Sequence, residues 1–400
     1  MAASRILLVS VLMAAECVAQ DEALERVKTE SARQNSLTTQ DFWKKSEAFR
    51  ERSAAFHAAI RDWIETQLPK SKAVLDAEFP YLSPKLNAVQ QAGLIAPRDN
   101  VFDGPANFGS IDHVRTSRPP GDPDRLLVNV GIDVPCGFDD AVYVYDYSQG
   151  SLRRILASRG ARDHGEIVSD VLFSKLDESG SRLILILRYG VQCGSTWNML
   201  AYDLFRLSAG APEAVPILSG EHGIWFGAEH PYQVRLELND LLMEIRDRSI
   251  DPVIHNRAHI LHYKVEDTAV TRIDPVALQP QDFVDEWLNQ PWEVMESRSA
   301  AAEDGKLKLW HEFLSGDFVG GEFSLVQACS NEPGQWQVGV DMSFIRGKQL
   351  PDPLPVYFLV QQLGQYQFKM TGISFDPEVS CPGESEPNEN SPSLFPVHEN

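Results

Sequence analysis

The sequence predicts a mainly β protein with a helical N-terminal region, in which four-stranded repeats precede a small α+β domain. Three observations lead to this fold class. Apolar residues recur at helical spacing in residues 20–107, alternating strands and an internal repeat occupy 108–276, and helices followed by strands return in 277–382. A chain of 400 residues has room for two domains with sizeable cores.

Residues 1–19 have the layout of a secretory signal peptide. Arg5 gives a positive start, residues 6–15 form an apolar run, and Cys17-Val18-Ala19 offers a small-x-small cleavage site before Gln20. The apolar run is too short to cross a bilayer, which takes about 20 residues. The sequence therefore predicts export to the periplasm or secretion, and it contains no later stretch apolar enough to span a membrane.

Two alternatives remain for this leader. It could be an amphipathic N-terminal helix, or a lipoprotein signal acylated at Cys17. A lipoprotein signal places a small residue before its cysteine, where this sequence has Glu16, so we do not expect a lipid anchor.

The cysteine count agrees with export. Cleavage before Gln20 leaves four cysteines, namely Cys136, Cys193, Cys329 and Cys381. An even number indicates disulfides in an oxidising compartment. None forms a C-x-x-C pair, so neither zinc nor thioredoxin-like chemistry is supported. Of the three possible pairings we predict Cys136–Cys193, which would join equivalent places in adjacent repeats, and Cys329–Cys381, which both fall in the C-terminal domain.

Charge limits the class of partner. The formal net charge is −21, and an acidic surface repels phosphate backbones and anionic headgroups. We therefore exclude nucleic acid as a partner.

The helical region is defined best at residues 42–68. An apolar stripe repeats every seven residues along it and consists of Phe42, Phe49, Phe56 and Trp63. A capping box from Thr38 to Asp41 precedes the stripe, and Pro69 follows it. A second helix is predicted at 84–91, with Ser83 as N-cap and Gly93 beyond its end. We expect the stripe to pack on the protein's own β domain, with docking on a partner as the alternative.

An internal repeat follows. RLLVNVGIDVPCG at residues 125–137 matches RLILILRYGVQCG at 182–194 without gaps, at an offset of 57 residues (193 − 136). The match continues from 142–146 to 199–203, so 108–157 and 165–218 are predicted as equivalent four-stranded units. A more diverged third unit has strands predicted at 232–238, 241–246, 258–265 and 269–273.

Repeats of this size with four strands each resemble β-propeller blades. The resemblance covers residues 108–276 and is architectural, because no WD or kelch signature is present. Three blades are fewer than a closed propeller uses. An antiparallel sandwich or an open array, covered at its ends by the N-terminal helices, is the alternative.

The C-terminal domain is predicted to contain two helices and four strands. Helices are expected at 282–288 and 307–314, and strands at 322–329, 335–344, 356–363 and 366–375. Gly364-Gln365 fits a two-residue hairpin turn. This order resembles the cone-shaped nuclear-transport-factor-type fold, which is found in binding proteins and enzymes alike. Residues 383–400 are polar and are predicted to be a disordered tail.

No catalytic motif marks the chain, and three clusters remain as candidate sites. His255, His259 and His262 are metal-ligand types, but the last two would point to opposite faces of one strand. Two acid–histidine pairs, Glu221-His222 and Glu229-His230, flank an expected aromatic loop. These four residues and Trp225 are candidate ligand-binding residues. Asp139 and Asp140 could contribute to calcium binding, although calcium takes six or more oxygens.

These observations predict an exported, non-catalytic binding or scaffold protein without a cofactor, whose repeat loops contact a protein or carbohydrate ligand. The alternative is a secreted glycosidase- or peptidase-like hydrolase. Its paired carboxylates would come from distant strands and so leave no local motif.

Overall fold

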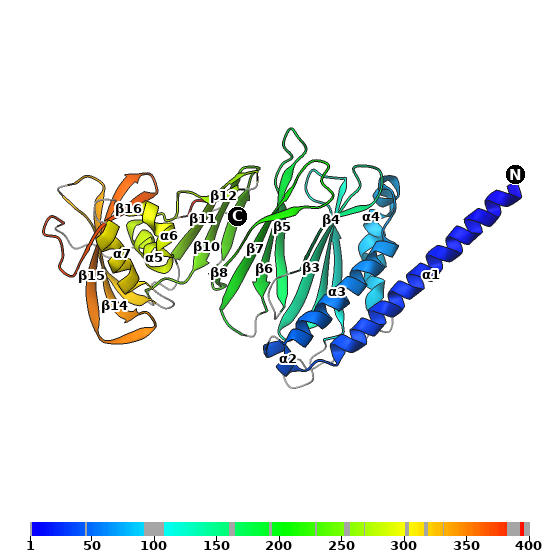
Figure 1. Cartoon of the computed structure of the whole chain (residues 1–400), viewed down its shortest axis with the longest axis horizontal. Helices are drawn as coiled ribbons and strands as arrows, with labels where there is room; N and C mark the ends of the chain where they lie inside the picture. The colour runs from blue at the N-terminus through cyan, green and yellow to red at the C-terminus, as the bar shows by residue number, and fades with distance from the viewer. Residues whose placement is uncertain are drawn as a thin grey trace. The chain divides into compact units, whose positions relative to one another are not determined.

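The computed structural model describes residues 2–44, 46–91, 108–159, 165–191, 194–228, 230–251, 257–267, 269–300, 304–315, 319–330, 332–381 and 393–395. The chain divides into two compact units, Met1–Glu221 and His222–Asn400. The protein is mostly β, with four antiparallel four-stranded sheets in the described residues (Figure 1). The predicted domain boundaries after residues 107 and 276 stay a prediction.

The first unit begins with helices α1 (Ala2–Asn35), α2 (Thr39–Trp43), α3 (Glu47–Gln67) and α4 (Lys72–Asn87). The predicted capping box is confirmed, since Thr38 Oγ1 accepts from the Asp41 amide and the Asp41 carboxylate accepts from the Thr38 amide. The predicted single helix over 42–68 is wrong in one respect. The box caps the short α2, and a second N-cap, Ser46, starts α3.

The second predicted helix also begins elsewhere. Instead of starting at Pro84, α4 starts at Lys72 and contains Pro80 and Pro84, and a 3₁₀ turn follows at Ala88–Gln91. Proline inside a helix removes a backbone hydrogen bond, but the buried side of α4 offsets that cost through three buried leucines. Ser83 is no N-cap, because its hydroxyl contacts Thr116 Oγ1 and accepts from the Thr116 amide. Gly93 lies outside the described residues.

Two sheets follow, and the last strand of the second one extends past Glu221 into the second unit. The first has the order β1 (Ile111–Ser117), β2 (Arg125–Val134), β3 (Gly137–Asp146), β4 (Arg153–Arg159), and the second has β5 (Glu166–Phe173), β6 (Arg182–Gly190), β7 (Trp197–Leu207), β8 (Val215–Trp225). Residues 142–146 lie in β3 and residues 199–203 in β7, the third strand of each sheet. The predicted equivalence of the two units is therefore confirmed.

The first sheet is covered on both faces. On one face, Phe56, Ile60, Trp63 and Ile64 of α3 belong to the same buried cluster as Val128 and Tyr143. On the other face, residues of β3 and β4 pack against residues of β6 and β7, including Val144 and Ile186. The helical stripe thus packs on the protein's own sheet, as predicted, and in Figure 1 α3 runs along that sheet.

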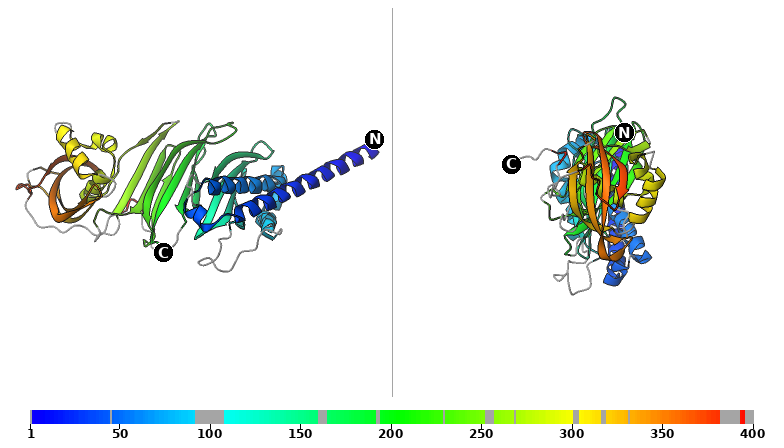
Figure 2. Two further views of the ribbon diagram at one scale, coloured as in Figure 1. Left: turned by 60° about the horizontal axis from the view of Figure 1, so that its bottom comes forward. Right: turned by 90° about the vertical axis from the view of Figure 1, so that its left-hand side faces the viewer.

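The second unit contains the predicted third repeat and the α+β region. The repeat consists of β9 (Tyr232–Leu236), β10 (Asp240–Asp247), β11 (Arg257–Glu266) and β12 (Ala269–Arg272). Helices α5 (Pro280–Asn289), α6 (Trp292–Met295) and α7 (Asp304–Leu314) precede β13 (Gly320–Ala328), β14 (Gln335–Ile345), β15 (Lys348–Gly364) and β16 (Gln367–Ser374). Figure 2 shows the yellow helices beside the orange sheet, and the two layers share one buried core.

Three details of this region differ from the prediction. Helix α6 was not predicted, because its four residues are too few for a periodic pattern. Strand β15 begins at Lys348, well before residue 356, although its first half carries Pro351, Pro353 and Pro355. Gly364 pairs with Gln367, so the hairpin turn is Gln365-Tyr366, with Tyr366 at φ 60°.

The predicted disordered tail, 383–400, lies outside the described residues except for residues 393–395. Of these three, Leu394 and Phe395 pack on an apolar cluster of the second unit. Within the described part of the chain, no helix has both the length and the apolar composition that crossing a bilayer requires.

Candidate functional site

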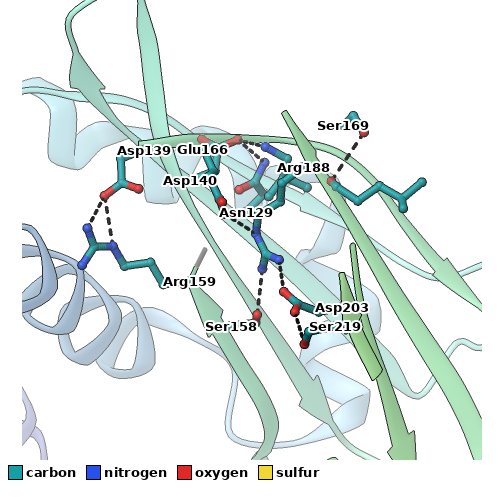
Figure 3. Close-up of polar contacts among 12 residues, drawn as sticks. Asn129, Asp139, Asp140, Ser158, Arg159, Glu166, Ser169, Arg188, Asp203 and Ser219 are labelled. Carbon is teal, nitrogen blue, oxygen red and sulfur yellow. Dashed lines mark hydrogen bonds and ion pairs between the residues drawn. The ribbon is translucent and has the colours of Figure 1, made fainter. Parts of the chain in front are cut away.

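Asp139 joins a helix to the first sheet. Its Oδ2 atom lies 2.8 Å from Nη2 of Arg159 on β4 (Figure 3). The same oxygen lies 3.2 Å from Nε2 of His57 on α3. Burial alone raises the pKa of Asp139, but Arg159 and His57 outweigh it and lower that pKa to about 2. Asp139 is therefore ionised and structurally engaged.

Asp140 has a different set of partners, because successive strand residues point to opposite faces. Its Oδ2 accepts from the amide of Val168 at 2.8 Å, and its Oδ1 lies 3.6 Å from Nε2 of His113. Gly131 permits this close packing, since a Cβ there would lie 2.4 Å from Cε1 of His113. Burial raises the pKa of Asp140 despite His113. The structure thus does not bring Asp139 and Asp140 to one site.

Arg188 organises the second sheet and was not singled out from the sequence. The fully buried guanidinium donates to Asp203 at 2.6 Å and to Ser158 at 2.7 Å, and Asp203 also accepts from Ser219 (Figure 3). The repeat pointed to one member of this network, the aspartate. Asp203 is equivalent to Asp146 (203 − 146 = 57), which likewise binds an arginine, Arg153.

The second unit contains a polar pocket of about 340 Å³. Strands β8, β10 and β11 and the end of α5 contribute most of its wall. The lining residues are His222, Asp247, Arg248, Ser249, Ile250, Arg257, His259, Asn289, Gln290 and Val319.

A buried carboxylate, Glu286 of α5, holds the inner wall of the pocket together. Its Oε2 lies 2.8 Å from Nδ1 of His259 and 3.2 Å from Nη2 of Arg257, and its Oε1 lies 2.5 Å from Nη2 of Arg272. Burial alone raises the pKa of Glu286, but His259 and the two arginines hold it well below its usual value. Glu286 therefore remains ionised.

The adjacent carboxylate, Asp285, positions the rim. It accepts from Ser249 Oγ at 2.8 Å and from the Ile250 amide at 2.9 Å, and it pairs with Nε of Arg257 at 2.9 Å. Asn289 Nδ2 donates at 2.8 Å to Oδ1 of Asp285, the oxygen that also pairs with Arg257. Through Asp285, helix α5 fixes the segment that follows β10 and the exposed Asn289 at the pocket.

Two histidines stack at this pocket. The rings of His222 and His259 have centroids 4.4 Å apart. Burial, together with His259, lowers the pKa of His222 well below its usual value, so His222 is neutral at pH 7. Nε2 of His259 is buried and has no hydrogen-bond partner among the described residues.

The predicted site residues are only partly brought together. His222 and His259 meet, whereas His262 is bound by Asp240 at 2.7 Å and His255 lies outside the described residues. The expected aromatic loop at residues 223–227 is wrong for residues 223–225, which belong to strand β8.

The remaining candidates are spread out. Glu221 and His230 are exposed, and neither they nor Trp225 line this pocket. Glu229 lies outside the described residues. The sequence held no local sign of a role for Glu286, because Glu286 lies on helix α5 and its partners lie on strands β11 and β12.

Comparison with known proteins gives little. No protein-family model and no curated protein match the chain. Among solved structures, it is similar to a GH43 β-1,3-galactosidase with galactodeoxynojirimycin, at 12% identity and a TM-score of 0.19. The match covers 70% of this chain and 81% of that one.

Proposed function

We propose that the protein is an exported binding protein whose polar pocket holds a small, uncharged, polyhydroxylated ligand such as a sugar. The observation that supports this is the composition of the pocket wall. Asp247, Arg248, Ser249, Asn289 and Gln290 place a carboxylate, a guanidinium, a hydroxyl and two amides around one cavity. Sugar hydroxyls donate and accept hydrogen bonds, and this set offers both kinds of group.

The electrostatics of the pocket favour an uncharged ligand. The buried arginine of its wall, Arg257, is matched by Asp285 and Glu286. His222 adds no charge at pH 7, because burial lowers its pKa. No large excess of either charge lines the cavity, so a phosphate or a metal cation has less to gain here than a neutral polyol.

Titration calorimetry against a panel of mono- and disaccharides tests the proposal. We expect one sugar class to bind, with Asp247→Asn weakening the affinity at least tenfold. Glu237→Gln, an exposed acid in the turn after β9, serves as the matched control and should bind like the parent chain. Absence of binding across the panel, or equal loss in both variants, would contradict the proposal.

A hydrolase is the second candidate, supported by the Glu286–His259 pair. Glu286 accepts from Nδ1 of His259 and so orients the ring at the pocket wall, where a ligand that reaches the buried Nε2 would meet a general base. His259→Gln would then abolish release of reducing sugar from a bound oligosaccharide while preserving its binding. An intact turnover rate in His259→Gln, or no turnover by the parent chain, would contradict the hydrolase proposal and leave binding as the one proposed function.

A further inference from the structure

A second feature lies on the opposite face of the β10–β11 pair from His259. Residue pairing sets Glu244 against Ile260 and Arg246 against Ala258, so these side chains share one face. We call Leu242, Glu244, Ala258, Ile260 and Leu278 the tail-binding face. Four of these residues form a small apolar cluster, and the fifth, Glu244, is a carboxylate with only 2% of its side chain exposed.

The chain's own C-terminal segment occupies this face. Oε2 of Glu244 accepts from Ser393 Oγ at 2.9 Å and from the Leu394 amide at 2.8 Å, while Oε1 lies 3.1 Å from Nη2 of Arg246. Leu394 and Phe395 pack on the apolar cluster. The buried carboxylate is thus satisfied partly by a segment that is distant in sequence, at a separation of 149 residues from Ser393.

These contacts use features that any short peptide can present. They need one hydroxyl, one main-chain amide and two adjacent large apolar side chains, and they involve only three residues of the tail. Three residues are far fewer than the roughly 20–30 residues a side of a stable protein interface. Eleven residues (392 − 381) separate this tail segment in sequence from Cys381, and a covalent link of this length raises its local concentration at the face.

We infer that the tail-binding face is a recognition site for peptide segments in which serine precedes two large apolar residues. Ser393, Leu394 and Phe395 then act as an internal ligand that an external peptide must displace. A buried carboxylate beside an apolar cluster suits such a segment, since the charge-assisted hydrogen bonds give orientation and the apolar side chains give affinity. This inference is independent of the proposed sugar pocket and uses the other face of the sheet.

Fluorescence anisotropy with a labelled peptide of residues 392–400 tests the inference. A variant that ends at Pro392 should bind the peptide at least tenfold more tightly than the full chain. Glu244→Gln in the shortened variant should weaken binding at least tenfold, whereas Glu237→Gln should leave it unchanged. A peptide in which both Leu394 and Phe395 are replaced by alanine should not bind.

A full-length variant with Leu394→Ala and Phe395→Ala provides the same vacant face if the shortened chain does not fold. It should also bind the unaltered peptide more tightly than the parent. Circular dichroism checks that each variant is folded. Failure of every folded variant to bind the peptide, or binding that ignores Glu244, would overturn the inference.

Discussion

Nδ1 of His259 lies 2.8 Å from Oε2 of Glu286, and both side chains are buried. The pair links strand β11 to helix α5 across 27 residues (286 − 259). Because Glu286 is ionised and can only accept, the hydrogen that the two side chains share resides on Nδ1 of His259. One carboxylate therefore fixes both the position of a strand and the orientation of a pocket residue's ring.

Glu286→Gln should destabilise the protein strongly. The substitution leaves Arg272 and His259 without the buried negative charge that they face, and breaking a buried ion pair costs about 3–5 kcal/mol. Urea denaturation followed by circular dichroism measures the loss. The exposed control Glu237→Gln should change the free energy of unfolding by less than about 1 kcal/mol, and an equal effect of both variants would refute the role of Glu286.

Asp139 should steepen acid unfolding. Its folded-state pKa of about 2 lies below the ordinary value of 3.8, so its stabilisation is full above about pH 4 and is lost as the pH falls towards 2. A shift of this size corresponds to about 2 kcal/mol. Asp139→Asn should be less stable than the parent at pH 6, and the gap between their urea midpoints should narrow by pH 2.5. A constant gap would contradict the ion-pair role.

Asp133 should make the free energy of unfolding depend on pH in the opposite direction to Asp139. Burial and the nearby Asp112 raise its pKa to about 6, against a weaker effect of Ser110, so the folded state favours the protonated form. Stability is then lost as the pH rises from about 4 to 6. Asp133→Asn should stabilise the protein at pH 7.5 by about 1 kcal/mol, allowing for partial solvent exposure, and should have no effect near pH 3.5. Thermal denaturation at both pH values tests this, and a destabilised variant at pH 7.5 would contradict it.

Local patterns in the sequence were enough for most of the fold, whereas the site depends on long-range contacts. The 57-residue offset and period-two alternation located the repeat strands, because each strand pairs with its sequence neighbour. Asp285 and Glu286 fall beside the apolar stripe of α5 and look like a solvent-facing side of an amphipathic helix. They are buried because Arg257 on β11 and Arg272 on β12 neutralise them, and periodicity does not record such partners.

Peptide mapping without reduction should recover Cys329 joined to Cys381, the predicted disulfide that the structure confirms. Cys136 is also disulfide-bonded, and its predicted partner, Cys193, lies outside the described residues. The mapping should therefore show Cys136–Cys193 as a second linked pair. Linkage of Cys136 to either C-terminal cysteine would refute the prediction.

Removal of the confirmed bond should weaken the protein. Replacing Cys329 and Cys381 together by serine opens a loop with a sequence separation of 52. Chain entropy predicts a loss of about 4 kcal/mol, as an upper figure. Urea denaturation of the double variant measures it, and an unchanged midpoint would show that the bond constrains little.

Export should leave a mature N-terminus near Gln20. The positive Arg5, the short apolar run and the small residues before Gln20 are the basis of this prediction. N-terminal sequencing of protein recovered from a periplasmic or culture fraction should begin within a few residues of Gln20. Recovery of exported chain that retains Met1 would refute it.

The strictly sequential strand order of every described sheet has a consequence for biogenesis. Each sheet closes its hydrogen bonds with strands that are made one after another, so none waits for a segment synthesised later than its own fourth strand. Such local pairing keeps contact order within each sheet low and favours rapid formation. A chain emerging N-terminus first can complete its sheets in turn, and each sheet pairs its two inner strands on both sides before the next sheet is made.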